Sequence, residues 1–499
     1  MNDPAGRLQI HLHRQTGGLG VRIQSSRLTS ASRVFIGKDL TATLETLPRL
    51  FSVCATAQTV ACVSAGEAAL GIPPHPRALA TRLLLVDLET VREHLWRLLL
   101  DWPRFLGESP QGAAMAQVMA AFDQGRRALA ANGDPLRTGP GRGTGAVRPD
   151  AATVAVATAS AATAPTAALT ALAAITRRQV LGQPPGDWLA TTRDLQTLRH
   201  WARTSDTAAA RLIDLVDRQG WAGLGRSPVA VLPPLTLATL EARLSGPGAE
   251  AFIATPLWQG AAAESTPFAR QRNQPLVADL ARELGNGLLP RLAAQLVELS
   301  SLLVALPRRL VALAESVPSD AHSDDSFDKP FGEPNAESID EQLDPPAPQS
   351  IIPSVNGAEE LLAAGQVPAV EPELTNPSSN TPERLALRAP PRPGPSAKVV
   401  PAQGETPQSP HTAATLSTGT GLAQVQAARG LLVHRLTLEQ GRLADYRILA
   451  PTEWNFHPQG AAALGLATLP AADEPTLRRL AGLFITALDP CVAYDISIS

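Results

Sequence analysis

The feature that most constrains how this chain can fold is a long proline-rich, acidic stretch in its second half. Of its 45 prolines, 18 fall between Pro318 and Pro410. Ten acidic residues and a single lysine lie between Glu315 and Asp344. Because few apolar residues are available there to offset the entropy cost of ordering, we predict that residues 315–420 are disordered. A packed core must therefore be built from the sequence on both sides of this segment.

Composition excludes several classes of protein. The chain has 499 residues, whereas one domain usually takes roughly 100–200 residues, so we expect two or three globular parts. A net charge of −3 leaves no basic surface of the kind that nucleic acid requires. Three cysteines do not make a disulfide framework, and the odd number fits a reduced cytoplasmic protein.

Two segments bear on the choice between a secreted, a membrane and a cytoplasmic protein. The N-terminus has no charged region followed by an apolar one, so we expect no secretory signal. Residues 151–176 carry no charge, but they are mostly alanine and threonine with Pro165 among them. That composition is only weakly hydrophobic, so we expect no membrane span. The chain is predicted to be soluble and cytoplasmic.

Hydrophobic periodicity predicts a helix-rich α+β chain with strand hairpins near both ends. Alternating apolar residues predict one hairpin at 8–23 and another at 432–449. Apolar residues three and four apart predict helices, at about 41–54, 76–102, 201–216, 275–316 and 474–487. The predicted parts are an N-terminal part at 1–107 that carries Cys54, a low-complexity linker at 108–165, a helical middle region at 166–314, the disordered segment at 315–420, and a C-terminal part at 421–499.

Taken alone, the motifs that carry chemistry are weak. Cys54 and Cys62 have a spacing that suits no standard zinc site, and both are interpreted as small buried residues. His11 and His13 form a pair that can bind metal, but such a pair is more typical of the solvent face of an amphipathic strand. The chain contains no glycine-rich phosphate loop and no HExxH or GxSxG motif.

Three segments at the two ends of the chain resemble the large subunit of nickel–iron hydrogenases. RLFSVCATAQTVACVSAGEAALGI, at 49–72, resembles its first metal-binding helix. ARGLLVHRLTLEQGRLADYRILAPTEWNFHP, at 428–458, resembles its Pro-Arg-Gly hairpin and Pro-Thr-x-Trp-Asn segment. LDPCVAYDIS, at 488–497, resembles its C-terminal Asp-Pro-Cys-x-x-Cys-x-x-His. The three occur in the family's order. The resemblance implies a helix-rich α+β fold whose long central helices bring the two cysteine segments together.

The departures from the family pattern concern the metal ligands. In the family four thiolates hold nickel and iron, which suits soft metals of this kind. Here Cys54 and Cys491 keep two of the four positions, while Phe51 and Tyr494 replace the other two cysteines and Ser497 replaces the histidine. Two thiolates cannot form the four-sulfur site. The resemblance therefore implies neither hydrogenase activity nor a stable nickel site.

The residues that surround iron in the family are better kept. In the family an arginine and a hydroxyl residue donate hydrogen bonds to the cyanides on iron, and Arg429 and Thr452 match them, with Pro451 before the threonine. A guanidinium and a hydroxyl are suitable donors to an anionic ligand in a dry pocket. Ala428 stands where the family has proline. Without the resemblance, Arg429 would be interpreted as a surface residue beside a turn.

The end of the chain bears on processing. The chain ends two residues beyond Ser497, the position of the family's histidine, whereas family precursors carry an extension that is cleaved once nickel is bound. We therefore expect no metal-triggered cleavage and a C-terminal tail that is free to move.

This pattern is similar to the HupK-type hydrogenase assembly proteins, relatives of the large subunit that have lost part of the ligand set. The resemblance implies a non-catalytic, cytoplasmic maturation scaffold or chaperone. It would transiently hold iron with its cyanide and carbonyl ligands and deliver that group to the hydrogenase large subunit, in contact with other maturation proteins. Cys54 and Cys491 would bind the metal, and Arg429, Pro451 and Thr452 would hold its diatomic ligands.

Two alternatives remain open. The chain could be a metal-free mimic of the large subunit that docks maturation partners through protein–protein contacts, with the acidic residues 315–344 as a binding arm rather than a solvated linker. It could also be a degenerate paralogue without a present role, in which case replacing Cys54 or Arg429 would leave hydrogenase output in the host unchanged.

Deleting residues 318–411 separates the scaffold from the docking mimic. Because this segment lies outside the three segments that resemble the family, we expect the deletion to leave iron loading of the purified protein unchanged. Hydrogenase output of the host is measured in parallel. Maturation that fails while iron loading persists would favour the binding arm.

Overall fold

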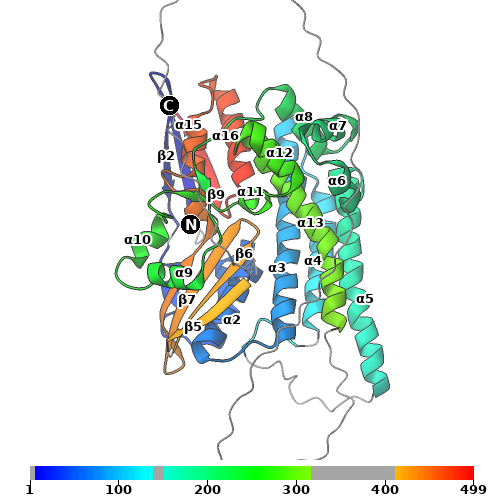
Figure 1. The fold of residues 1–499 in the computed structure, drawn as a ribbon, viewed down its shortest axis with the longest axis vertical. Helices are drawn as coiled ribbons and strands as arrows, with labels where there is room; N and C mark the ends of the chain where they lie inside the picture. Colours follow the sequence, from blue (N-terminus) through cyan, green and yellow to red (C-terminus); the bar gives the residue numbers. More distant parts are fainter. Residues whose placement is uncertain (1–5, 28, 132, 139–150, 316–410, 418) are drawn as a thin grey trace, which may run out of the picture. The chain divides into compact units, whose positions relative to one another are not determined.

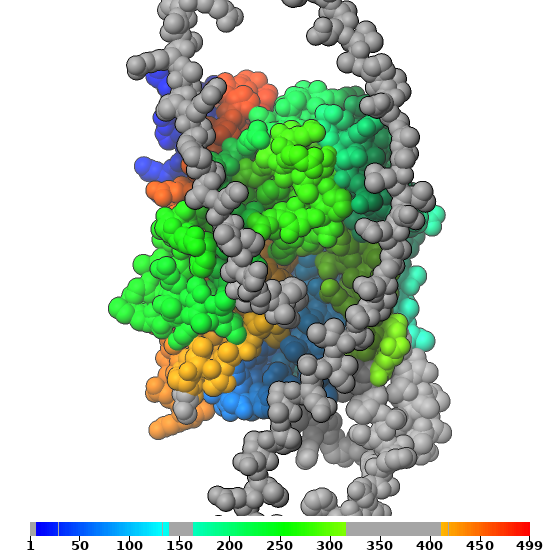
Figure 2. All heavy atoms as spheres, viewed as in Figure 1, coloured from blue at the N-terminus to red at the C-terminus, as the bar shows by residue number. Residues whose placement is uncertain are grey.

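The computed structural model describes residues 6–27, 29–131, 133–138, 151–315, 411–417 and 419–499. Most of the segment predicted to be disordered, 315–420, lies outside these ranges. The described residues belong to one compact unit that joins the chain on both sides of this segment. Its helix-rich α+β architecture confirms the predicted fold class. Figure 1 shows the elements, and Figure 2 shows the same face with all atoms, much of it formed by the residues in green, which include α9 to α12.

Four long helices pack side by side as a bundle (Figure 1). They are α3 (Pro76–Trp96), α4 (Gly112–Ala130), α5 (Ala151–Thr176) and α13 (Leu288–Glu315). α3 buries Leu84, Leu88, Val91 and Leu95, which recur at helical spacing. Past its end the chain continues through a π turn and a 3₁₀ turn to Leu106. The helices predicted at 76–102 and 275–316 are therefore confirmed, the second as α12 (Pro275–Leu284) followed by α13.

The linker predicted at 108–165 was largely wrong. α4 lies within it and α5 begins within it. The alanine-rich sequence suggested low complexity, but alanine is the strongest helix former, and Met115, Val118 and Phe122 of α4 are buried at helical spacing. Gly125 lets α4 approach α3 closely, because a Cβ there would lie 3.1 Å from a Leu88 methyl. Residues 139–150 lie outside the described part.

An antiparallel sheet of four strands packs against helix α2 (Ala55–Leu70). Its strands are β5 (His411–Ser417), β6 (Thr420–Ala427), β7 (Gly430–Glu439) and β8 (Arg442–Leu449), in that order. The hairpin predicted at 432–449 is confirmed as β7 and β8. Helix and sheet meet closely at Gly421, where a Cβ would lie 2.0 Å from the Ala65 carbonyl oxygen.

Helix α2 and the turn before it are apolar enough to resemble a membrane span. Among the described residues, Ser52–Leu70 is the one helical stretch long and apolar enough to cross a membrane, and 72% of its most apolar window is buried inside the fold. α2 is buried on nearly all sides because it is enclosed between the sheet and neighbouring helices, as expected of a core helix.

A second sheet joins the two ends of the chain. β1 (Arg7–Gln15) and β2 (Gly18–Ser25) form the antiparallel hairpin that was predicted, and β9 (Ala493–Ile498) pairs with β1 in parallel, from Arg7↔Ala493 to Leu12↔Ile498. The expectation of a free C-terminal tail was therefore wrong. Tyr494, Ile496 and Ile498 alternate with exposed residues and pack on the main core. The predicted parts 1–107 and 421–499 are thus joined in one sheet.

The remaining elements are mostly short helices in the middle of the chain. They are α1 (Leu40–Leu50), α6 (Pro185–Thr191), α7 (Leu195–Thr204), α8 (Ala208–Arg218), β3 (Ala230–Val231), α9 (Leu237–Leu244), α10 (Ala249–Ala254), β4 (Ala263–Glu264), α11 (Pro267–Gln271), α14 (Pro451–Asn455), α15 (Ala461–Ala467) and α16 (Glu474–Leu488). α16 is the closing helix that was predicted, whereas the single helix expected at 201–216 is divided between α7 and α8.

Replacing Ile496 with aspartate is expected to unpair β9. The change places a charge on the strand face that packs on the core, and we expect the free energy of unfolding to fall by about 2 kcal/mol. Asp495→Ala is the matched control, because Asp495 lies on the exposed face and its ion pair with Arg7 is exposed; we expect it to cost less than about 1 kcal/mol. Urea unfolding of both variants measures this, and equal losses would contradict the assignment of the two faces.

Candidate metal centre between the two ends of the chain

Cys54 lies where α2 begins. α1 ends at Leu50 and a single 3₁₀ turn, Ser52–Cys54, leads into α2, with Cys54 as its N-cap residue. The first backbone N–H groups of α2 donate to the carboxylate of Glu89 on α3, at 2.9 Å from Thr56 N and 3.0 Å from Ala57 N. This carboxylate satisfies N–H groups that the helix itself leaves unpaired and fixes the start of α2 against α3.

Cys491 lies where α16 gives way to β9. The helix ends at Leu488, and Asp489 has the left-handed conformation, with φ 52°. That residue turns the chain through Pro490 to Cys491 and into β9. A left-handed residue other than glycine is tolerated best for asparagine and aspartate, and here the Asp489 side chain is also held by two arginines.

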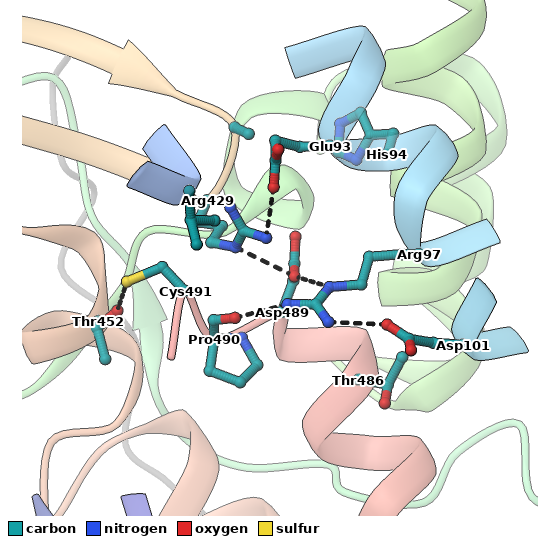
Figure 3. A network of polar contacts seen from close by, with 12 residues as sticks. Glu93, His94, Arg97, Asp101, Arg429, Thr452, Thr486, Asp489, Pro490 and Cys491 are labelled. Carbon is teal, nitrogen blue, oxygen red and sulfur yellow. Dashed lines mark hydrogen bonds and ion pairs between the residues drawn. The ribbon is translucent and has the colours of Figure 1, made fainter. Parts of the chain in front are cut away.

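A buried network of charged groups holds this turn (Figure 3). Asp489 Oδ1 accepts from Arg97 Nε, in the π turn that follows α3, at 2.5 Å and from Arg429 Nε, in the turn between β6 and β7, at 3.2 Å. Arg429 Nη2 also donates to Glu93 at 2.8 Å, and Arg97 Nη2 donates to the Pro490 carbonyl oxygen at 2.7 Å. Burial alone would raise the pKa of Asp489, but the two guanidinium groups outweigh it and hold that pKa below its ordinary value.

Four of the five predicted site residues line one small cavity of ≈ 50 Å³, namely Cys54, Arg429, Pro451 and Cys491. The structure therefore brings together residues from opposite ends of the chain. Much of the remaining wall is apolar, and it includes Phe51, Ala428 and Leu432. A wider cleft of ≈ 920 Å³ adjoins it, because Arg429 and Cys491 also line that cleft.

The fifth predicted residue, Thr452, lies beside the cavity. Its hydroxyl is 3.0 Å from the sulfur of Cys491 (Figure 3). Tyr494, which stands where the resembling family has a cysteine, lies in β9 and lines the wider cleft. His11 and His13 lie in β1 on the far side from the core and do not belong to this site.

Arg429 brings an unused hydrogen-bond donor to the cavity wall. Its side chain is buried, and its Nη1 has no hydrogen-bond partner among the residues that the structure describes. Buried polar groups are nearly always paired, so an unpaired guanidinium N–H in a cavity wall indicates a place for an anionic or acceptor ligand.

Arg27 is a residue of the site that sequence reasoning missed. It follows β2, and its Nη1 donates to the sulfur of Cys491 at 3.1 Å, while its Nε lies 3.4 Å from Glu453 Oε1. Burial would lower the pKa of Arg27, but the contacts of its guanidinium with Cys491 and Glu453 outweigh burial and hold that pKa above its ordinary value. No signal in the sequence distinguishes it from the other polar residues after the first hairpin.

The sulfur atoms are the groups in this cavity best suited to hold a metal. Burial and the neighbouring Cys491 raise the pKa of Cys54 to about 12, so in the free protein Cys54 is a neutral thiol. Among the described residues, no group of three or more histidine, cysteine, aspartate or glutamate side chains is placed to hold a metal ion. The cavity offers two soft ligands and a guanidinium donor, which is an incomplete metal site.

Relatives of this chain are found among hydrogenase expression/formation proteins, although no family model matches it. It is 26% identical over 499 residues to HupV of Azotobacter chroococcum, covering 99% of both chains. It is 45% identical over 105 residues to HoxV of Cupriavidus necator and 39% identical over 97 residues to HupK of Azotobacter vinelandii. Each of these two matches spans only 27% of the relative's length. All three relatives are named hydrogenase expression/formation proteins.

Comparison with solved structures identifies the fold of the chain. The Ni-Fe-Se hydrogenase from D. vulgaris Hildenborough matches with a TM-score of 0.52 and 13% identity, covering 96% of this chain and 94% of that one. This chain therefore has the fold of the nickel–iron hydrogenase large subunit. The resemblance inferred from the cysteine segments is confirmed: the chain is a homologue of the HupV, HupK and HoxV proteins.

The ion pair between Arg27 and Glu453 provides a test of the site's electrostatics. Both side chains are largely buried, with 12% and 8% exposed, so Arg27→Gln leaves a buried carboxylate without its cation. We expect the free energy of unfolding to fall by roughly 3 kcal/mol. The double variant with Glu453→Gln should cost less than the sum of the two single changes. Arg33→Gln is the control, because its pair with Glu250 is exposed and is worth at most about 1 kcal/mol. If the losses of unfolding free energy in Arg27→Gln and Glu453→Gln add up fully in the double variant, the two side chains do not interact and the ion pair is contradicted.

Proposed function

We propose that this protein is a non-catalytic hydrogenase maturation scaffold that transiently holds iron carrying two cyanides and one carbon monoxide. It passes this group to the large subunit of a nickel–iron hydrogenase. The names of the relatives support an accessory role in hydrogenase formation. One observation carries the finer proposal: two thiols from opposite ends of the chain line a small cavity together with Arg429, whose buried Nη1 has no hydrogen-bond partner among the described residues.

Cys54 and Cys491 bind the iron in this proposal. Thiolate sulfur is a soft ligand that suits iron of this kind. Arg429 then donates from its unused Nη1 to a cyanide nitrogen, and its other contacts, to Glu93 and Asp489, hold the guanidinium plane in place. A rigid donor recognises one ligand geometry better than a flexible one.

Pro451 and Thr452 complete the recognition of the diatomic ligands. Pro451 is the first residue of α14 and lines the cavity, so it fixes the position of the threonine that follows it. The Thr452 hydroxyl faces the Cys491 sulfur. Once that sulfur binds metal, the hydroxyl proton is available to a cyanide. The apolar remainder of the wall, which includes Phe51 and Leu432, keeps water from competing for these donors.

Incomplete ligation suits a carrier better than a catalyst. A carrier must accept its cargo and also release it, and two thiolates hold a metal less firmly than four. Phe51 fills part of the cavity wall where the resembling family has a thiolate, and Tyr494 lies in β9. Both replacements argue against a stable nickel site and against hydrogenase turnover.

The wider cleft provides the route for transfer. It shares Arg429 and Cys491 with the small cavity, so cargo bound at the thiols is within reach of a partner seated in the cleft. The proposed partners are the hydrogenase large subunit and other maturation proteins, and the proposed location is the cytoplasm.

An infrared spectrum of protein purified anaerobically from its own host tests this proposal. Cyanide and carbonyl ligands on iron absorb where protein is nearly transparent, so we expect their bands in the wild-type protein and their loss in Cys54→Ser. Cys62→Ala is the matched control, because Cys62 is a buried thiol on the same helix that does not line the cavity; its bands should persist. A blank wild-type spectrum, repeated in cells blocked at the transfer step, would overturn the proposal in favour of the metal-free docking mimic.

A further inference from the structure

A line of buried polar side chains leads from Cys54 into the interface between α2 and the four-stranded sheet. Gln58 Nε2, one helical turn after Cys54, lies 3.7 Å from the Cys54 sulfur. Gln58 Oε1 lies 2.9 Å from His434 Nε2, and His434 Nδ1 lies 2.9 Å from the Tyr446 hydroxyl. Gln58, His434 and Tyr446 are each at most 2% exposed. We call these three residues the polar chain.

The fold explains how the polar chain is assembled. Gln58 projects from α2 towards the sheet, while His434 of β7 and Tyr446 of β8 are diagonal neighbours on one face of a strand pair. Their rings meet edge to face, with centroids 5.5 Å apart. Much of the interface around them is apolar. Because burying polar groups is costly unless each is hydrogen-bonded, a purely structural contact would be served at least as well by three apolar side chains.

The donors of the polar chain all point towards Cys54. Burial lowers the pKa of His434 to about 3, so its ring is neutral at pH 7 and carries one proton. The amide oxygen of Gln58 can only accept, so that proton is on Nε2 and Nδ1 accepts from Tyr446. Gln58 is then left with its N–H groups facing the sulfur. Hydrogen bonds aligned in this way polarise one another.

The far end of the polar chain meets another thiol. The Tyr446 hydroxyl forms a hydrogen bond with Cys62, and burial raises the pKa of both groups, that of Cys62 to about 12. Both therefore keep their protons at neutral pH. Because Nδ1 of His434 carries no proton, the tyrosine proton is directed at it.

We propose that His434 and Tyr446 are positioning residues that lock the Gln58 amide so that it donates a hydrogen bond to the Cys54 sulfur and thereby weakens that sulfur's hold on a bound metal. This inference rests on the proposed function, in which Cys54 is an iron ligand. Hydrogen bonds to a coordinating sulfur withdraw electron density from it and change the electronic state of the metal. For a carrier, a weakened sulfur ligand favours release.

Two variants disturb the polar chain, one at each end. Gln58→Leu deletes the donor, and Tyr446→Phe deletes one hydroxyl while keeping the ring. The control is Thr59→Val, because the Thr59 hydroxyl is on the same helix and, among the described residues, donates to the Ala55 carbonyl oxygen alone. With the hydrogen bond lost, the sulfur donates more electron density to iron, and the carbonyl band should shift to lower frequency. We expect the larger shift in Gln58→Leu, a smaller one in Tyr446→Phe and none in Thr59→Val.

A second measurement needs no cargo. Nitrogen-15 spectra of histidine-labelled protein report which ring nitrogen of His434 carries the proton, and the His434→Gln variant identifies its signal. We expect the proton on Nε2, and a change of the Nδ1 signal in Tyr446→Phe, which also shows whether that variant is folded. A proton on Nδ1 would overturn the inference.

The failure of this inference is distinguishable from the failure of the proposed function. If the wild-type protein shows the carbonyl band and this band does not shift in Gln58→Leu or Tyr446→Phe, the proposed role of the polar chain is wrong, while the proposed scaffold function stands. A wild-type protein without bands would remove the scaffold, and the tuning role with it.

Discussion

The carboxylate of Asp489 is the constraint on which the candidate site depends. It accepts hydrogen bonds from Arg97 in the π turn that follows α3 and from Arg429 in the turn between β6 and β7. It therefore ties the end of α16 to the helical bundle and to the four-stranded sheet at once. Leaving any one of these buried charges unpaired costs several kcal/mol, on the order of 3–5, so the three groups fix one another. Cys491 follows two residues later, and its position next to α2 is a consequence.

A second constraint holds the segment around Cys491 on its C-terminal side. β9 pairs with β1 along six residues, so Cys491 lies between a helix cap and a strand that are both anchored. The N-terminal hairpin fixed by this pairing also carries Arg27 to within 3.1 Å of the Cys491 sulfur, although 464 residues separate the two in sequence. Arg27, Cys54, Arg429 and Cys491 line one cavity because the fold brings the two ends of the chain together.

What could be predicted from the sequence was local or carried by a motif. The two hairpins and the helices α3 and α13 follow from apolar periodicity, whereas α4 and the start of α5 were mistaken for a linker because their sequence is rich in alanine. Cys54, Arg429 and Cys491 were found because they stand in segments that resemble a known family. The prediction of a free tail was wrong because the partner of this segment is distant in sequence. AYDISI alternates as a strand does, but it pairs with β1 at the other end of the chain. Arg27 and Gln58 were missed because nothing in their neighbourhoods is unusual until packing brings them to the two sulfur atoms.

The charge balance of the cavity bears on how firmly a metal is held in the proposed function. Both arginines in its wall are already compensated, Arg27 by Glu453 and Arg429 by Glu93 and Asp489. The cavity therefore has little spare positive charge to stabilise thiolates, which agrees with the raised pKa of Cys54. Metal binding must then rely on the metal–sulfur bonds themselves and on donors to the diatomic ligands. In the proposed function, two sulfur atoms bind the metal less firmly than four would, which suits its transfer to a site that offers four thiolates.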